Sequence, residues 1–126
     1  MKYLTDYTQK AQTALIEKTG AFFAFSNKQF TEQLQPDTKY YDFGAGVFVP
    51  QKNAKAYVEG LNQIQVDGVS ADIAENGKKA IIMRELNNFE CGYTGDISDC
   101  ADALHQYAIS PDEILEVFNS NRGELA

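Results

Sequence analysis

The sequence holds few of the side chains that bind metal ions or attack substrates, because it has only two cysteines and one histidine. A structural zinc ion takes about four thiolate or imidazole ligands, and Cys91, Cys100 and His105 cannot complete such a set. Aspartates recur at every third position from 96 to 102, but this spacing drifts around a helix and no loop supplies carbonyl ligands. We therefore predict neither a metal site nor a cofactor, and expect these aspartates to cap or solvate a helix.

Long apolar runs are also absent, since the longest spans only Ala21 to Phe25. A helix needs roughly 20 consecutive apolar residues to cross a bilayer, so the sequence predicts no membrane span. The segment Met1–Asp6 lacks the apolar core of a secretory signal peptide. We therefore expect a cytoplasmic protein in which Cys91 and Cys100 stay reduced.

Positive charge is missing from one long stretch, because Glu85 to Glu116 contains eight Asp or Glu residues and no Lys or Arg. The whole chain has a net charge of −7, and residues 63–126 hold twelve Asp or Glu against four Lys or Arg. A surface of this kind repels nucleic acid and anionic lipid, and it can attract a basic protein. The alternative interpretation is a solvated acidic face that only aids solubility.

Four acidic residues of this stretch are candidates for contact with a basic partner: Asp99, Asp102, Asp112 and Glu116. Helix capping explains Asp99 and Asp112, because carboxylates near a helix N-terminus stabilise its free N–H groups. Asp102 and Glu116 have no such local task. We expect both of them to face solvent and to belong to the surface that meets the partner.

Turn signals divide the chain into short helices and one hairpin. The hydrophobic content of 44% is that of a folded protein, and we expect residues 1–126 to form a single domain. The predicted fold class is mainly α, with five or six short helices and a small β-hairpin around residues 39–50. Gly60 and Gly68 disfavour one long helix between them, so we expect a kink or a break around residues 66–69.

Helix boundaries are marked by capping residues and by glycine. The clearest start is formed by Ser110, Pro111 and Glu113, because a serine cap and a glutamate three residues later satisfy each other's N–H groups. Proline suits the first helical position, where its missing N–H costs nothing. Gly20 suits the left-handed conformation that ends a helix. These signals predict a helix start at residue 111 and a helix end before residue 20.

The stretch from Gly77 to Tyr107 is predicted to hold two packed helices that meet at a tight turn over residues 93–96. Apolar residues recur at helical spacing in the first helix, as far as Tyr93, and in the second, which begins at Asp96. Arg84 and Glu85 fall outside the first apolar stripe. We expect Arg84 to form a structural ion pair with a carboxylate.

Aromatic residues surround the predicted hairpin loop Gly44-Ala45-Gly46. Tyr40, Tyr41, Phe43 and Phe48 would resemble the hot spots of a protein interface if they are exposed, and would be core residues if they are buried. The sequence leaves both interpretations open. The glycines favour a turn over a phosphate site, because the segment has no GxGxxG pattern and no following Lys-Ser or Lys-Thr.

A small hydrolase or transferase would use Glu85, Glu90 or His105, if the fold gathered them in one cleft. A spacing of five residues puts the two glutamates about 140° apart on a helix. His105 borders an apolar stripe, which is typical of a structural histidine. Cys91 and Cys100 could be nucleophiles, but they could equally be small core residues. The sequence therefore predicts no catalytic residue, and an enzyme remains an alternative interpretation.

Several segments together resemble a known family. They read GAFFAFSNKQF at Gly20–Phe30, DIAENGKKAII at Asp72–Ile82 and TGDI at Thr94–Ile97, with the residues from Arg84 to Glu90 fitting as well. In these segments the chain is similar to a family of small acidic proteins found in bacteriophages and gut-associated bacteria. The resemblance implies an accessory role in a phage or mobile element, and it brings no activity and no catalytic residues.

The favoured function is therefore protein–protein interaction by a small acidic accessory protein that engages a basic host surface. A host DNA-binding protein or nuclease, bound through imitation of phosphate charge, is one concrete form of this partner. We expect no direct contact with nucleic acid or with a membrane. The alternatives are the small enzyme described above and a structural component of a virion.

Overall fold

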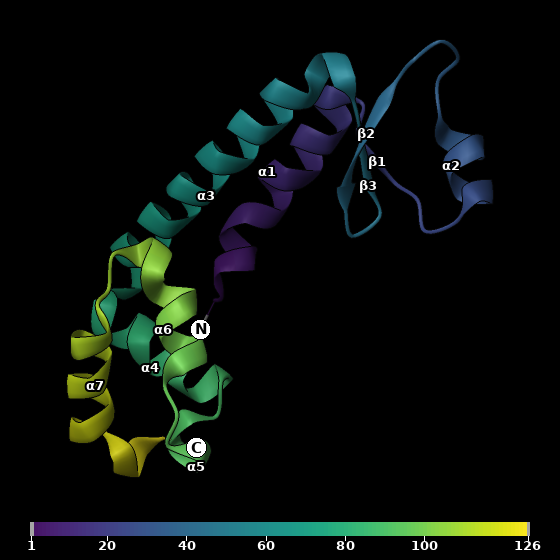
Figure 1. Ribbon diagram of the computed structural model, residues 1–126. Helices are drawn as coiled ribbons and strands as arrows, with labels where there is room; N and C mark the ends of the chain where they lie inside the picture. The colour runs from purple at the N-terminus through teal and green to yellow at the C-terminus, as the bar shows by residue number, and fades with distance from the viewer. Residues whose placement is uncertain (1, 126) are drawn as a thin grey trace. The chain divides into compact units, whose positions relative to one another are not determined.

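The computed structural model describes residues 2–125 and consists mainly of helices (Figure 1). In this part of the chain there are seven α-helices and a small three-stranded antiparallel sheet, which confirms the predicted fold class. The chain divides into two compact units, with the boundary between Gly68 and Val69. We call the part before this boundary unit 1 and the part after it unit 2. The single domain expected from the sequence stays a prediction.

Unit 1 begins with α1 (Leu4–Thr19), whose two ends are fixed by local interactions. At its start, the Tyr3 N–H donates a hydrogen bond of 2.7 Å to the Asp6 carboxylate. At its end, Gly20 takes a φ of 77°, a left-handed conformation that glycine adopts without strain. The helix therefore ends where the sequence predicts, and the chain turns into the sheet.

The sheet of unit 1 has the strand order β1-β3-β2. Its central strand, β3 (Val47–Pro50), pairs with β2 (Tyr40–Gly44) as the predicted hairpin and with β1 (Phe22–Phe23) on the other side. Helix α2 (Asn27–Gln33) follows β1, and the Ser26 hydroxyl caps its N-terminus. The apolar run that begins at residue 21 thus supplies a short strand that the hairpin prediction did not include.

Each face of this sheet carries its own layer of side chains, because neighbouring residues of a strand point to opposite faces. On one face four rings form a cluster with contacting centroids 4.7 to 5.9 Å apart; they belong to Phe22, Phe30, Tyr40 and Phe48. On the other face Val49 packs with Ala21 and Tyr57 in a small hydrophobic core. The sheet therefore lies between α2 and the long helices of unit 1.

The longest helix, α3 (Ala54–Asn76), is continuous, so the predicted kink or break beside Gly68 is wrong. Its glycines are explained by α1, which lies alongside it (Figure 1). A Cβ atom at Gly68 would lie 2.5 Å from the Thr8 methyl carbon, and one at Gly60 would lie 2.6 Å from a methyl carbon of Leu15. Glycine is therefore required for the close approach of two helices and does not mark a chain break.

Unit 2 contains the end of α3 and four further α-helices. They are α4 (Lys78–Asn88), α5 (Cys91–Thr94), α6 (Ser98–Leu104) and α7 (Pro111–Ser120). Short 3-10 turns follow α6 at His105–Tyr107 and α7 at Arg122–Glu124. Helix α4 packs against α5, α6 and α7 and is therefore the centre of this unit.

The predicted pair of helices between Gly77 and Tyr107 is present as α4 and α6, but the connection between them differs. Residues 91–94 form α5, and Tyr93, which was expected in a buried stripe, is 88% exposed. Helix α6 begins at Ser98 instead of Asp96. The reason is a turn in which the Asp96 carboxylate accepts hydrogen bonds from the Ser98 N–H and hydroxyl.

Helix α7 starts as its sequence predicts. The Ser110 hydroxyl accepts a hydrogen bond of 3.2 Å from the Glu113 N–H, and the Glu113 carboxylate accepts one of 2.8 Å from the Ser110 N–H. Ile114 and Phe118 are buried on the inner side of the helix. Both its cap and its apolar face therefore hold α7 in unit 2.

We predict that Gly68→Ala lowers the free energy of unfolding by on the order of 1 kcal/mol. The new methyl group would overlap the buried, β-branched Thr8 side chain, and such overpacking outweighs the better helix propensity of alanine. Urea denaturation followed by circular dichroism measures the change. Gly60→Ala in the same helix is the matched control and should cost less, because the flexible Leu15 side chain can move. Equal stability of the two variants would contradict the close packing at Gly68.

Candidate functional site

A buried network of polar side chains lies in unit 2. The Asp72 side chain has 0% exposure and accepts two hydrogen bonds from the Arg84 guanidinium, at 3.0 and 2.9 Å. Asn76 donates another over 2.8 Å, and the Tyr107 hydroxyl donates to the same carboxylate. Both oxygens of Asp72 are therefore engaged by the protein itself. Each oxygen accepts two hydrogen bonds, so the carboxylate joins neighbouring segments of unit 2 and has no lone pair left for a ligand.

The hydrogen bonds of this network stabilise its charges. Burial opposes ionisation of Asp72, but hydrogen bonds from Arg84, Tyr107 and Asn76 lower its pKa below the ordinary value. Burial likewise opposes the charge on Arg84, and the hydrogen bond to Asp72 nevertheless raises its pKa. Burial and the neighbouring Asp72 raise the pKa of Tyr107. Asp72 and Arg84 thus form the structural ion pair that was predicted for Arg84, with Tyr107 as a neutral donor.

Glu85 lies beside this network, and its burial corrects the prediction that it falls outside the buried face of α4. Only 8% of the residue is exposed, and its carboxylate lies 3.6 Å from Arg84 Nε. Burial raises the pKa of Glu85, while the charges of Arg84 and Asp72 act on it in opposite directions. Ionisation of Glu85 is therefore less favourable in the folded unit than in water.

The three candidate catalytic residues lie in different surroundings. Glu85 is buried in α4, whereas Glu90 and His105 are exposed. The hollows described in unit 1 are lined by none of the three. Across residues 2–125, no group of three or more His, Cys, Asp or Glu side chains is arranged to hold a metal ion. The geometry therefore gives no support to a hydrolase or transferase built on these residues.

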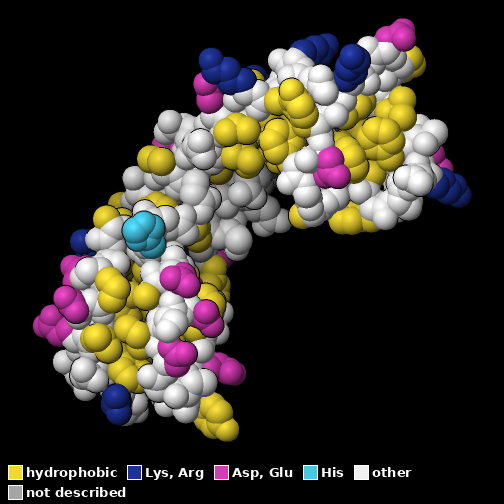
Figure 2. Space-filling view, viewed as in Figure 1, with side chains coloured by type: hydrophobic (Ala, Val, Ile, Leu, Met, Phe, Trp, Pro, Cys, Tyr) yellow, Lys and Arg dark blue, Asp and Glu magenta, His cyan; other side chains and the backbone are white. Residues whose placement is uncertain are grey.

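The four acidic candidates are all exposed in unit 2, with Asp99 and Asp102 on α6 and Asp112 and Glu116 on α7. Figure 2 shows Asp and Glu side chains over these helices with few Lys or Arg side chains among them. Unit 2 holds eleven Asp or Glu residues and four Lys or Arg, whereas unit 1 holds seven acidic residues and seven lysines. The negative charge of the chain is therefore concentrated on unit 2.

The four hairpin aromatics fall into two pairs on opposite faces of the sheet. Tyr40 and Phe48 belong to the ring cluster and are partly buried. Tyr41 and Phe43 lie on the α3 side and are 50% and 43% exposed. With Val58 of α3 they border an open apolar hollow of about 590 Å³. Tyr40 and Phe48 are thus packed side chains of the fold, whereas Tyr41 and Phe43 are exposed as the residues of an interface would be.

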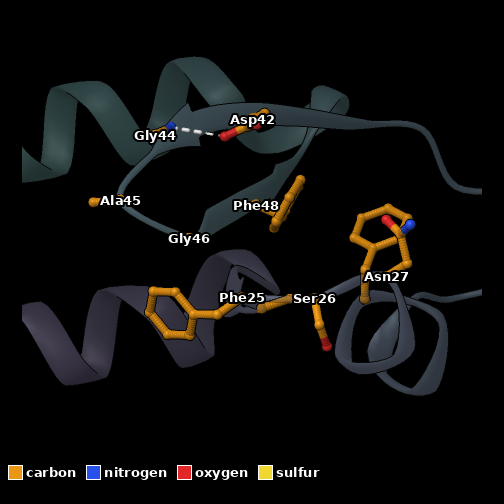
Figure 3. A pocket seen from close by; sticks show the side chains of 10 residues that line it. Phe25, Ser26, Asn27, Asp42, Gly44, Ala45, Gly46 and Phe48 are labelled. Carbon is orange, nitrogen blue, oxygen red and sulfur yellow. Dashed lines mark hydrogen bonds between the residues drawn. The ribbon is translucent and has the colours of Figure 1, made fainter.

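A second hollow of about 530 Å³ lies between the hairpin loop and the start of α2 (Figure 3). The Phe25 ring lies against Gly46, whose φ of 79° and missing Cβ make room for it. The Asp42 carboxylate faces the loop and accepts the Gly44 N–H over 2.8 Å. Because a carboxylate already binds this N–H, the glycine loop is a poor site for phosphate.

Residues 4–121 match a protein family described as a family of unknown function (DUF7659). The chain belongs to this family. A comparison with curated proteins finds no match, and a comparison with solved structures finds none either. The family match reaches from α1 to the end of α7, so membership rests on both units and not on one motif.

Two cysteines of this family member lie in the core of unit 2. Cys91 and Cys100 are fully buried and are not joined by a disulfide. Burial raises the pKa of both thiols, and for Cys100 the value is about 12. A thiol that stays protonated is a poor nucleophile, so the two cysteines act as small core residues.

The length and apolar content of a helix decide whether it can cross a bilayer. Across residues 2–125, none of the helices has both the length and the apolar content that crossing a bilayer requires. The long helix α3 (Ala54–Asn76) has the length alone. The candidate sites on this chain are the exposed carboxylates of unit 2 and the exposed aromatics of unit 1.

We predict that Glu85→Gln raises the free energy of unfolding at about pH 7. The folded state raises the pKa of Glu85 above its ordinary value of 4.5, so ionisation costs stability as pH rises past that value. A neutral amide avoids this cost. The gain should shrink toward zero at about pH 3.5, where Glu85 is protonated in both the folded and the unfolded chain.

Urea denaturation at the two pH values measures this change. Glu90→Gln is the matched control, because Glu90 is exposed and follows the same helix, and it should change stability little at either pH. A Glu85→Gln chain that is destabilised at about pH 7 but not at about pH 3.5 would contradict the prediction, because it would show that the ionised carboxylate stabilises the fold through Arg84.

Proposed function

We propose that this chain is a small accessory protein that binds a basic protein partner through the acidic surface of unit 2. The observation that carries the proposal is the exposure of Asp102 and Glu116, whose side chains make no hydrogen bond or ion pair within residues 2–125. Acidic residues with a task in the fold, such as Asp96 and Glu113, accept hydrogen bonds at helix starts. The side chains of Asp102 and Glu116 remain available to a partner.

The chemistry of this surface defines the partner as one that presents Lys or Arg side chains. Exposed carboxylates contribute mainly long-range attraction, which speeds encounter and is screened by salt. Nucleic acid is disfavoured at this surface, because its phosphates have the same sign of charge. A DNA-binding protein or a nuclease already has a surface suited to phosphate. Such a protein is the concrete partner we propose, bound by imitation of phosphate charge.

An accessory role in a bacteriophage or mobile element agrees with this binding function. The segments that resemble small acidic proteins of bacteriophages and gut-associated bacteria support such a role. A host partner that binds DNA would place the complex in the cytoplasm. Tyr41 and Phe43 of unit 1 offer exposed apolar area for a further contact.

We predict that the combined substitution Asp102→Asn and Glu116→Gln slows association with the partner several-fold at low salt. Removing two exposed charges weakens the attraction that guides encounter, while dissociation changes little. The denaturation midpoint should stay nearly unchanged, since both side chains face solvent. The partner is first captured from a host lysate on the full chain and eluted with a salt gradient. Stopped-flow mixing at two ionic strengths then measures the association rate.

The matched control is the combined substitution Glu17→Gln and Glu32→Gln, which removes the same net charge from exposed residues of unit 1. It should slow association less than the change in unit 2. Equal slowing by both pairs would mean that net charge, and not this surface, guides binding. An association rate equal to that of the unmodified chain at both ionic strengths would remove Asp102 and Glu116 from the interface.

A further inference from the structure

Strand β2 is an edge of the sheet in unit 1, because the strand order is β1-β3-β2. The Lys39 carbonyl accepts the Gln51 N–H over 2.9 Å, and the pairing with β3 continues regularly as far as Asp42. Inward and outward backbone groups alternate along an antiparallel strand, so the N–H and C=O groups of Tyr40 and Asp42 point away from β3. No other strand in residues 2–125 pairs with this edge. Such an edge is a template for another chain.

An apolar surface accompanies the open edge. Tyr41 and Phe43 project from β2 on the side of α3, and both are about half exposed, as is Val58 of α3. All three border the apolar hollow of about 590 Å³. A chain that adds to the edge would therefore bury apolar side chains in addition to forming backbone hydrogen bonds.

The charges around this edge favour a second copy of the same chain as its occupant. Unit 1 has equal numbers of lysines and of Asp or Glu residues, so two copies of it do not repel each other as two copies of unit 2 do. Lys39 lies on the face of Tyr41 and Phe43, and Asp42 lies on the other face. When two copies of the strand pair antiparallel about Tyr41, no lysine faces a lysine and no carboxylate faces a carboxylate. The edge can therefore pair with its own copy without like charges directly opposite each other.

We propose that β2 pairs antiparallel with β2 of a second copy, about a twofold axis beside Tyr41. Hydrogen bonding selects this register. With each Tyr40 opposite Asp42 of the second copy, the outward N–H and C=O groups of Tyr40 bond those of Asp42 on the other strand. A register centred on Asp42 would set two carboxylates opposite each other, which is unfavourable. A register centred on Tyr40 would place Asp42 opposite residue 38, which precedes the strand, so the outward N–H and C=O groups of Asp42 would have no strand residue to pair with.

This pairing makes specific neighbours. Tyr41 faces Tyr41 of the second copy, and Lys39 faces its Phe43. Both are non-hydrogen-bonded pairs, in which the Cα atoms lie about 4.5 Å apart. The exposed aromatic faces of the two strands join into one surface, and the Lys39 side chain reaches the opposite Phe43 ring. The proposal concerns unit 1 and does not depend on the acidic surface of unit 2.

Sedimentation of the full chain over a range of concentrations tests for the dimer. Tyr41→Lys removes the central aromatic pair and sets two cations face to face, so it should raise the dimer dissociation constant at least about tenfold. The matched control is Phe23→Lys, because Phe23 is 48% exposed and lies on the opposite edge strand, β1. It should leave the constant unchanged. Circular dichroism establishes that both variants remain folded.

Cysteine substitutions test the register. With oxidised glutathione as the oxidant, Tyr41→Cys should form a disulfide-linked dimer. Lys39→Cys alone should not, because its two copies would lie about 13 Å apart along the strands. Mixing the Lys39→Cys chain with the Phe43→Cys chain should produce the cross-link. The unmodified chain is the blank, because Cys91 and Cys100 are buried.

Three results would overturn the proposal. The first is a chain that stays monomeric up to about 1 mM. The second is a dimer that Phe23→Lys weakens as strongly as Tyr41→Lys. The third is a dimer that Lys39→Cys alone cross-links as fast as Tyr41→Cys, since that would place the twofold axis away from Tyr41.

Discussion

The fold of unit 2 depends on the buried ion pair between Asp72 and Arg84. Taking both charges out of water is costly, and the cost is met only because each oxygen of the carboxylate also receives a hydrogen bond, from Asn76 or from Tyr107. These residues come from the end of α3, from α4 and from the turn after α6. The ion pair therefore fixes how three separate segments of unit 2 meet.

This division between buried and exposed charge bears on function. Asp72 and Arg84 are committed to the fold, whereas Asp102 and Glu116 are exposed and have no internal partner within residues 2–125. Unit 1 is organised differently, by an aromatic cluster on a small sheet and by glycines that let α1 and α3 approach. Its open strand edge leaves backbone groups available, so the two units offer different chemistry to partners: carboxylates on one, hydrogen-bonding groups and aromatics on the other.

Local signals were predictable from the sequence, and contacts between distant segments were not. Capping at Ser110 and the turn at Gly20 need only neighbouring residues, and both are found as predicted. The role of Gly68 depends on Thr8, which is far away in sequence, so a glycine that permits packing resembled a helix break. Arg84 was expected to pair, but nothing local singles out Asp72 as its partner. The exposure of Tyr41 depended in the same way on which elements cover each face of the sheet.

A double-mutant cycle on the buried pair tests the central claim most directly. Asp72→Asn, Arg84→Met and the combined variant are compared with the unmodified chain by urea denaturation. Each single substitution leaves a buried group without its charged partner and should destabilise unit 2, by about 3–5 kcal/mol for Arg84→Met. The combined variant should lose at least about 2 kcal/mol less than the sum of the two. Losses that add to within about 0.5 kcal/mol would contradict the account, because Asp72 and Arg84 would then act independently.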